Sequence, residues 1–288
     1  MTLLKILVLA AIQGAAELLP VSSSAHVIVA AKLMGLDPTS PEMTLLLVML
    51  HTGTMFAVII FFWNSWKKGF FASREVLWVS TKLALAATFL TGTIGLFLKY
   101  LIEKLMLKGV PHAEIELIFG NLALISASLA VVGVLIIFAG MKSRRLPGQD
   151  AVLGVKEACG IGAVQGICLP FRGFSRSGAT ISAGLIMGIS KMKAEEFSFA
   201  LAVVLTPPVI VREVLRLLKA QHSAALDVTG IAGLFYPSLL GMVLSFASGL
   251  LALRWLSNWL ERGRWHFFGV YCLCASAIVF FLHSAVLK

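Results

Sequence analysis

The stretch "GFSRSGAT", residues 173–180, sets an arginine between two serines in a part of the chain that otherwise has the composition of a membrane segment. Residues 160–170 before it are uncharged, and residues 181–189 after it are apolar and small. A permanent charge in hydrocarbon costs roughly 2.5–3.5 kcal/mol on insertion scales. Arg176, which has a second arginine, Arg172, just upstream, therefore needs an anionic partner that offsets this cost.

The composition of the whole chain is that of an integral membrane protein. Of its 288 residues, 59% are hydrophobic and 13% are charged, and the mean hydropathy is +0.93, whereas soluble domains contain about 25% charged residues. The net charge of +10 is typical of the Lys and Arg excess in membrane-protein loops. Because no basic patch lies on a soluble domain, nucleic acid is not expected as a partner, and membrane lipids are.

Hydrophobic runs predict six transmembrane helices, because about 20 apolar residues cross a bilayer. These runs cover residues 43–63, 79–98, 116–140, 197–218, 230–256 and 266–287. Four shorter runs form two pairs, at 4–18 with 23–35 and at 157–169 with 178–189. A polar tip interrupts each pair, "LLPVSSS" in the first and "LPFRGFSRSG" in the second. This pattern predicts two re-entrant helix-loop-helix hairpins, whose irregular backbone is buried in protein or lines a wet cavity.

The two predicted hairpins resemble each other in sequence. Gln13-Gly14 matches Gln165-Gly166, and "LMGL" at 33–36 matches "IMGI" at 186–189. Three predicted spans separate the copies, and an odd number of crossings inverts the second copy relative to the first. Inverted-topology repeats place a shared site near the membrane midplane, between discontinuous helices whose ends face each other.

The repeat defines the expected organisation of the chain. We expect a single membrane domain over residues 1–288, with repeat one at about 1–140 and repeat two at about 156–288. Lys and Arg are more frequent in the loops on the side of residues 141–157 than on the other side. The positive-inside rule then places those loops in the cytoplasm and both termini, with the first hairpin tip, on the outer face.

The first tip carries an acid, an amide and a serine-histidine pair. Gln13 and Glu17 are four residues apart and project from one helical face, and Ser23 and His26 are three apart, again on one face. The serines open the second helix, where hydroxyls usually cap free N–H groups. Ser22 is therefore interpreted either as a cap or as a ligand-facing hydroxyl.

The second tip is predicted to begin a helix with an anion site. Free N–H groups and the positive end of the helix dipole favour an anion there, and an arginine adds a bidentate clamp suited to phosphate. The candidate residues are Gly173, Ser175, Arg176, Ser177 and Thr180. An alternative stays open in which Glu17 only neutralises Arg176 as a structural pair. His51, in "MLHTGT" at 49–54, is interpreted as a polar packing residue, and a position near the cavity stays open for it.

At these residues the sequence resembles the undecaprenyl pyrophosphate phosphatase family, also called the bacitracin-resistance protein family. The resemblance is carried by "QGAAELLPVSSSAH" at 13–26, which fits the family's (E/Q)-x-x-x-E pattern, by "GFSRSGAT" at 173–180, and by "EEFSFALAV" at 195–203. It extends over nearly the whole chain, with matching span order. It implies a multi-pass enzyme of the bacterial inner membrane that removes the terminal phosphate of undecaprenyl pyrophosphate on the outer face and so recycles the cell-wall lipid carrier.

The resemblance also implies roles for individual residues. Glu17 corresponds to the family's essential acid, Ser23 and His26 to its proposed nucleophile or hydrogen-bonding pair, and Arg176 to its phosphate-binding arginine. The substrate-binding set that it implies is Ser22, Arg172, Gly173, Ser175, Ser177 and Thr180. Family members need a divalent cation, Mg²⁺ or Ca²⁺. Two positions depart from the pattern: Gln13 stands where many relatives have a glutamate, and Arg172-Gly173 stands where the family has Pro-Gly.

These residue types suit phosphoryl transfer, which is mostly positioning and charge stabilisation. Glu17, the amide oxygen of Gln13 and the diphosphate could hold the cation. Two routes stay open, attack by Ser23 with His26 or Glu17 as general base and attack by an activated water, and we favour the serine route slightly. A lipid-phosphate or anion transporter with a midplane site is the alternative function. The sequence also leaves a homodimer open.

Overall fold

The computed structural model describes residues 2–37, 41–106, 121–145, 152–223 and 228–285. Within these ranges the chain forms ten helices and no strand, which confirms the all-α prediction. Six helices are long and apolar enough to cross a membrane. They are α3 (Pro41–Gly69), α4 (Arg74–Met106), α5 (Leu122–Arg145), α8 (Lys191–Ser223), α9 (Val228–Glu261) and α10 (His266–Ala285). Each of the six predicted spans falls on one of them, although residues 116–120 and 286–287 lie outside the described part.

The four shorter apolar runs form four short helices. They are α1 (Leu3–Leu18), α2 (Ser23–Leu33), α6 (Val155–Cys168) and α7 (Arg176–Ile186). Helix α1 packs against α2 and α6 packs against α7, so each pair is a helical hairpin. With 16 residues, α1 is about 24 Å long, which is less than the roughly 30 Å of the hydrocarbon core.

The hairpins lie among the long helices and contact them through glycines. Helix α1 packs on α9, and a Cβ at Gly14 would lie 1.8 Å from the hydroxyl oxygen of Ser248 and 2.5 Å from the carbonyl oxygen of Ser245. Helix α6 packs on α4, and a Cβ at Gly166 would lie 2.8 Å from the carbonyl oxygen of Thr91. The two glycines that match in the sequence repeat are thus both points of close helix approach.

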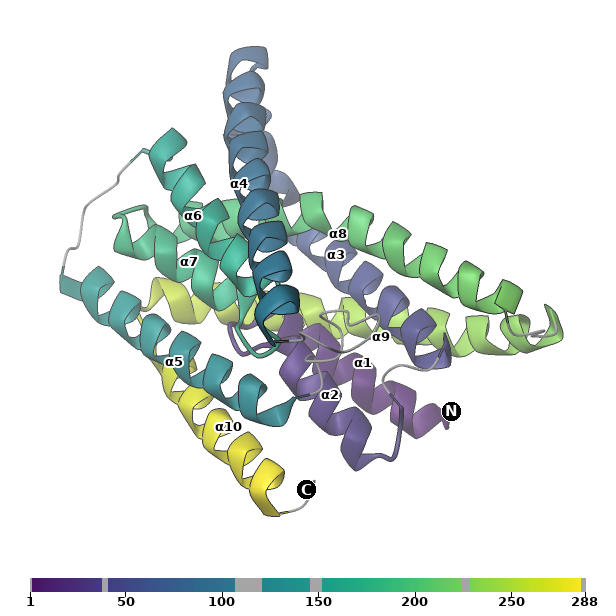
Figure 1. Cartoon of the computed structure of the whole chain (residues 1–288). Coiled ribbons are helices and arrows are strands. Elements are labelled where there is room, and N and C mark those ends of the chain that lie inside the picture. The colour runs from purple at the N-terminus through teal and green to yellow at the C-terminus, as the bar shows by residue number, and fades with distance from the viewer. Residues whose placement is uncertain (1, 38–40, 107–120, 146–151, 224–227, 286–288) are drawn as a thin grey trace.

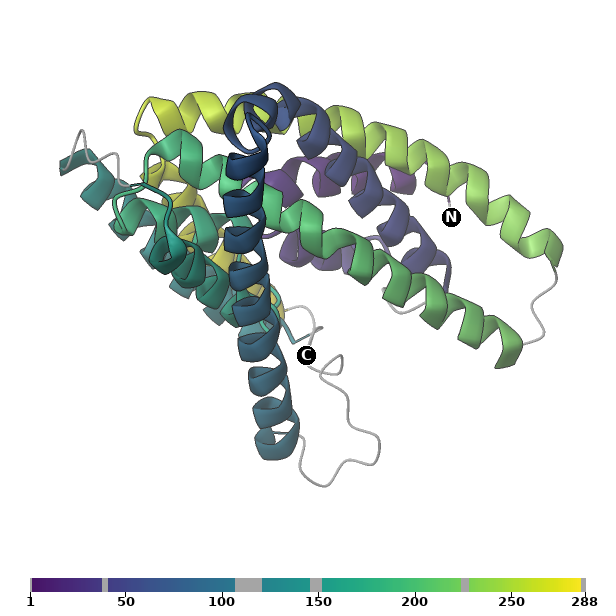
Figure 2. The same ribbon diagram turned by 90° about the horizontal axis from the view of Figure 1, so that it is seen from above.

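The long helices surround the two hairpins (Figure 1). Helices α5 and α10 pack side by side, and α7 rests on α5. Helices α3, α8 and α9 run out together from the centre in both views (Figures 1 and 2). Each hairpin tip therefore has long helices packed around it, and α3 passes close to the first tip through its contact with α1.

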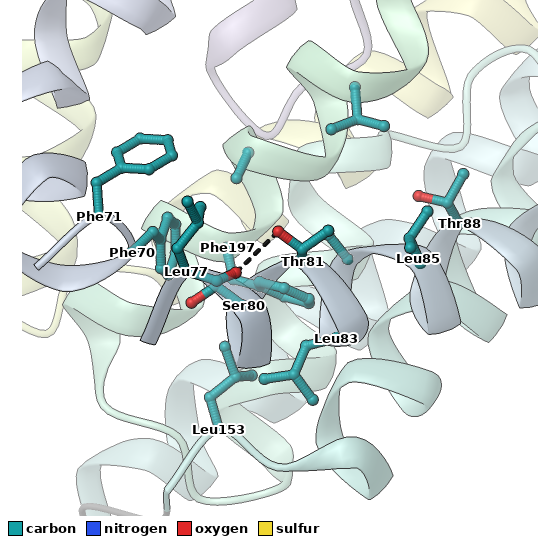
Figure 3. A pocket seen from close by; sticks show the side chains of 13 residues that line it. Phe70, Phe71, Leu77, Ser80, Thr81, Leu83, Leu85, Thr88, Leu153 and Phe197 are labelled. Carbon is teal, nitrogen blue, oxygen red and sulfur yellow. Dashed lines mark hydrogen bonds between the residues drawn. The ribbon is translucent and has the colours of Figure 1, made fainter. Parts of the chain in front are cut away.

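An apolar pocket lies between α4 and α8 (Figure 3). Its lining includes Phe70, Leu77, Leu83 and Phe197, together with the hydroxyl-bearing Thr88. None of the residues that the sequence nominates for chemistry lines it. The residues that the sequence nominates for chemistry therefore lie elsewhere, at the hairpin tips.

The close approach at Gly14 predicts a stability effect. We expect Gly14→Ala to lower the free energy of unfolding by about 1–3 kcal/mol, because the added methyl overlaps the backbone of α9. Gly92→Ala is the control, since a Cβ at Gly92 meets no atom of the described residues within 4 Å and alanine is the better helix former by roughly 0.5–1 kcal/mol. Thermal unfolding of both purified variants in detergent measures the difference. Equal midpoints would contradict the close packing of α1 on α9.

Candidate active site

The first tip gathers polar groups around the carboxylate of Glu17. Helix α1 ends at Leu18 and Pro20 follows in the tip, as the sequence predicts. The Ser23 hydroxyl donates a hydrogen bond of 2.5 Å to Oε2 of Glu17, and the Gln13 side-chain amide donates one of 3.1 Å to the same oxygen. Glu17 is largely buried, with 17% of its side chain exposed. Its charge is thus directed into the protein and toward the second tip.

Ser22 does not cap α2, which corrects one of its two sequence interpretations. The residue has φ 68° and ψ 91°, in the left-handed region that L-residues other than glycine rarely adopt. Its side chain makes no capping hydrogen bond, and its hydroxyl lies 3.4 Å from that of Ser24. The Ser22 carbonyl oxygen accepts a hydrogen bond from Nδ1 of His26, one turn later, at 2.8 Å.

The second tip is the helix start that the sequence predicts. The Ser175 hydroxyl caps α7 by accepting a hydrogen bond from the Gly178 amide at 3.2 Å. Gly173 has φ +98°, and a Cβ there would lie 2.6 Å from the carbonyl oxygen of Ile125, so both backbone angle and space require glycine. Arg172, just before it, is half-buried. The N-terminus of α7 is therefore held firmly against α5.

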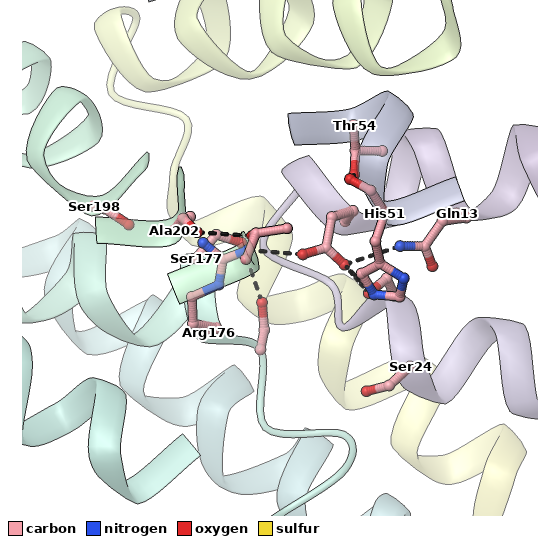
Figure 4. Close-up of polar contacts among 12 residues, drawn as sticks. Gln13, Ser24, His51, Thr54, Arg176, Ser177, Ser198 and Ala202 are labelled. Carbon is pink, nitrogen blue, oxygen red and sulfur yellow. Dashed lines mark hydrogen bonds and ion pairs between the residues drawn. The ribbon is translucent and has the colours of Figure 1, made fainter. Parts of the chain in front are cut away.

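The two tips meet, although more than 150 residues separate them in the sequence. Nη2 of Arg176 donates a hydrogen bond of 2.7 Å to Oε1 of Glu17. The Ser177 hydroxyl donates one of 3.2 Å to the carbonyl oxygen of Leu19. Figure 4 shows Arg176 and His51 on opposite sides of this junction, with Gln13 on the His51 side. The two hairpin tips thus meet at Glu17 and Arg176, as the sequence predicts.

Arg176 has donor capacity beyond its bond to Glu17. Its Nη1 is buried and has no hydrogen-bond partner among the residues that the structure describes. A buried, unpaired donor on a charged group is costly, by about 1–3 kcal/mol or more. A guanidinium with one nitrogen on Glu17 and another unpaired is suited to a second oxyanion, such as a phosphate oxygen.

Thr180 faces the protein rather than the junction. Its hydroxyl donates a hydrogen bond of 2.8 Å to the carbonyl oxygen of Arg176, one turn earlier, and lies 2.6 Å from the hydroxyl of Ser198 on α8. The first contact lies within α7, and the second ties α7 to α8, so that together they hold the helix that carries Arg176. Thr180 therefore holds the helix that carries Arg176 in place and does not face Glu17.

His26 makes two hydrogen bonds, and neither is to Ser23. Nδ1 bonds to the Ser22 carbonyl oxygen at 2.8 Å and Nε2 to the hydroxyl of Tyr271, on α10, at 2.7 Å. The two rings lie nearly parallel, with their planes 15° apart. The serine and the histidine that share a helical face in the sequence thus have different partners, since the Ser23 hydroxyl bonds to Glu17.

His51 lies beside Glu17, although the sequence favours a packing role for it and leaves a position near the cavity only as an alternative. Its Nε2 lies 3.7 Å from Oε2 of Glu17, and its Nδ1 bonds to the carbonyl oxygen of Leu47 at 2.8 Å. The available signal was a histidine within an otherwise apolar run, followed by two threonines at 52 and 54. Helix α3 carries it beside the first tip because α3 packs on α1.

The site contains few groups that could hold a metal without substrate. Among the described residues, no group of three or more His, Cys, Asp or Glu side chains could hold an ion. Glu17 offers one carboxylate, and the amide of Gln13 lies beside it. Magnesium often binds through one or two carboxylates and completes its shell with substrate phosphates and water. The donor set fits a cation that is held together with the substrate.

Comparison with known proteins identifies the family of the chain. The model of a protein family described as bacitracin resistance protein BacA matches residues 6–278 of the chain. The chain belongs to this family. The family resemblance carried by the two tip motifs is thereby confirmed.

Relatives of this BacA-family chain match it over nearly its full length. It is 58% identical to undecaprenyl-diphosphatase 2 of Acinetobacter baylyi over 281 residues, covering 97% of each chain. It is 33% identical to undecaprenyl-diphosphatase 2 of Burkholderia ambifaria, over 98% of this chain and 96% of that protein. It is 29% identical to the undecaprenyl-diphosphatase of Rhodopirellula baltica, over 98% of both.

Proposed function

We propose that this protein is an undecaprenyl-diphosphatase. It hydrolyses undecaprenyl pyrophosphate to undecaprenyl phosphate and inorganic phosphate, and so recycles the lipid carrier of cell-wall synthesis. Membership of the BacA family and 58% identity to a protein of that name support the activity. The enzyme is a multi-pass membrane protein of the bacterial inner membrane, and its diphosphate site faces the periplasm or cell exterior.

The observation that carries the proposal is the junction of Glu17 with Arg176. The guanidinium binds the carboxylate through Nη2 at 2.7 Å, while its buried Nη1 is unpaired among the described residues. A non-bridging phosphate oxygen would satisfy Nη1, and the N-terminus of α7 adds the free amides and positive dipole end that favour phosphate. Ser175, Ser177 and Gly173 shape this cradle, and Arg172 adds a second cation near it.

Ser23 is placed to be the nucleophile. Its hydroxyl donates its hydrogen to Glu17 at 2.5 Å, which leaves the oxygen lone pairs available for attack and sets a carboxylate where the proton must go. Attack on the terminal phosphorus forms the Oγ–P bond and breaks the bond to the bridging oxygen, whose electron pair leaves on undecaprenyl phosphate. Arg176 and the α7 amides stabilise the charge that develops on the non-bridging oxygens. Water then hydrolyses the phosphoserine.

A divalent cation, Mg²⁺ or Ca²⁺, completes the site. Glu17 and the amide oxygen of Gln13 would hold it together with diphosphate oxygens of the substrate. When bound, it neutralises charge on the transferred phosphate. The polyprenyl tail extends from the site between the long helices into the lipid.

The architecture that we propose is an inverted repeat with two re-entrant hairpins. Repeat one is about residues 1–140 and repeat two about 156–288. The matched glycines Gly14 and Gly166 support it, because each packs closely on the second long helix of the opposite repeat, α9 or α4. The length of α1, shorter than a bilayer, supports a hairpin that enters and leaves on one face. A homodimer would place two such sites in one assembly.

Phosphate release by the purified protein tests the activity. In detergent no gradient exists, so we expect inorganic phosphate from a polyprenyl diphosphate only if the protein is an enzyme. A chelator should abolish the release, and added Mg²⁺ or Ca²⁺ should restore it. Binding of the lipid without release would instead support the alternative function, a lipid-phosphate or anion transporter. If the chelator left phosphate release unchanged, the proposed requirement for a divalent cation would be wrong, while the phosphatase activity itself would stand.

A further inference from the structure

We propose that His51, not His26, accepts the proton of the water that this hydrolysis consumes. The inference rests on the proposed phosphatase function. One water is consumed whether it attacks a phosphoserine or the diphosphate itself, so the proposal does not depend on the first nucleophile. It assigns different roles to two histidines that both lie at the first tip.

The hydrogen bonds of the two rings fix their tautomers. Nδ1 of His26 bonds to the carbonyl oxygen of Ser22, and Nδ1 of His51 bonds to that of Leu47, each at 2.8 Å. A carbonyl oxygen only accepts, so Nδ1 carries the hydrogen in both rings. In each neutral imidazole the lone pair that can receive a proton is therefore on Nε2.

The two Nε2 atoms have different surroundings. Nε2 of His26 accepts the hydroxyl hydrogen of Tyr271 at 2.7 Å, so its lone pair is engaged by α10. Nε2 of His51 lies 3.7 Å from Oε2 of Glu17, beyond hydrogen-bond distance, and 38% of the His51 side chain is exposed. The reachable lone pair of the site is thus that of His51.

His51 is also distinct among the side chains that contact Glu17. Arg176 is permanently protonated, the amide of Gln13 takes up no proton at neutral pH, and Ser23 donates its hydrogen to the carboxylate. Of the described contacts of Glu17, only the one with His51 offers a further proton acceptor.

A water can bind to His51 beside the carboxylate of Glu17. Oε2 of Glu17 already accepts hydrogen bonds from Ser23 and Gln13, whereas Nε2 of His51, 3.7 Å from it, can take one hydrogen of the water and leave a lone pair of the water free for a phosphorus. In the step, the water oxygen bonds to phosphorus and the P–O bond to the leaving oxygen breaks. The leaving oxygen keeps that electron pair. One water proton passes to Nε2 of His51, and the other stays on the phosphate. On the serine route Glu17 returns the Ser23 proton to the Ser23 oxygen, and on either route the imidazolium releases its proton to solvent.

Steady-state kinetics in detergent with a polyprenyl diphosphate test the assignment. We expect His51→Ala and His51→Gln to lower kcat roughly 100-fold with KM changed little, because glutamine preserves hydrogen bonding but takes up no proton. Thr52→Val is the matched control and should stay near wild type, since the Thr52 hydroxyl donates only to the Val48 carbonyl oxygen of its own helix among the described contacts. A His51→Gln enzyme with near wild-type kcat would overturn the proposal.

Two rescue measurements separate proton transfer from packing. Added imidazole should restore part of the activity of His51→Ala and none of that of His26→Ala. Gln13→Glu should restore activity to His51→Gln, because a carboxylate there would lie beside the same oxygen of Glu17, which the Gln13 amide reaches at 3.1 Å. Failure of both rescues in variants that unfold at the wild-type temperature would refute the role of His51. Failure of the wild-type protein to release phosphate would refute the phosphatase function instead.

Discussion

Replacing Arg176 by alanine should reduce phosphate release roughly 1000-fold, in line with the loss of one preorganised oxyanion donor. The guanidinium joins the two tips through its 2.7 Å bond to Glu17 and presents a buried Nη1 that the described residues leave unpaired. Arg176→Lys should recover little, because a lysine keeps the charge but not the planar pair of donors. Steady-state phosphate release from detergent-solubilised protein measures both variants.

The matched control for this prediction is Arg262→Lys. Arg262 is exposed and follows α9 directly, away from both tips. We expect its activity to equal that of the wild type. If Arg176→Lys and Arg262→Lys were equally active, the guanidinium would have no part in phosphate binding, and the pair with Glu17 would be structural only.

The second large effect is expected for Glu17→Gln, which keeps the shape of the side chain and removes its charge. Loss of the proton acceptor for Ser23 and of the carboxylate for the cation should lower kcat by about 10³-fold. Removing one partner of a buried ion pair also destabilises, by roughly 3–5 kcal/mol when burial is complete. Because 17% of the Glu17 side chain is exposed, we expect a smaller loss of stability than that, with folded protein still available for assay.

Glu103→Gln is the control for the charge change itself. Glu103 pairs with Lys99 one turn earlier on α4, at 3.7 Å. Ion pairs of this kind, one turn apart on a helix surface, contribute little to stability, about 0.3–0.5 kcal/mol. Activity and thermal midpoint should both remain at the wild-type level. A Glu17→Gln enzyme that is folded and fully active would remove the acid from the mechanism.

The helices could be predicted from the sequence because their signals are local. Length and apolar composition separate six spans from four short runs, and Pro20 and Gly173 mark the tips between the short ones. The pairing of Glu17 with Arg176 could also be predicted, because opposite charges inside a membrane usually pair with each other. The prediction of the helices needs only the composition of each segment, and the prediction of the ion pair needs only the charges of its two residues.

The missed features depend on contacts between segments that are distant in sequence. His51 lies at Glu17 only because α3 packs on α1, and Tyr271 reaches His26 from α10. A single histidine in an apolar run carries no sign of which neighbour it will face. The side chain of Ser22 was interpreted as a possible cap because serines favour helix starts, but its hydroxyl makes no capping hydrogen bond, and the sequence does not signal its left-handed backbone.

The central claim is that the two hairpin tips bind one diphosphate together. It is tested most directly by the affinity of the purified protein for a polyprenyl methylenediphosphonate, a substrate analogue that cannot be hydrolysed. We predict that Arg176→Ala weakens this binding roughly 10-fold to 100-fold, as expected for losing hydrogen bonds to a charged group, while Arg262→Lys leaves it unchanged. Equal affinity of wild type and Arg176→Ala for the analogue would contradict the account.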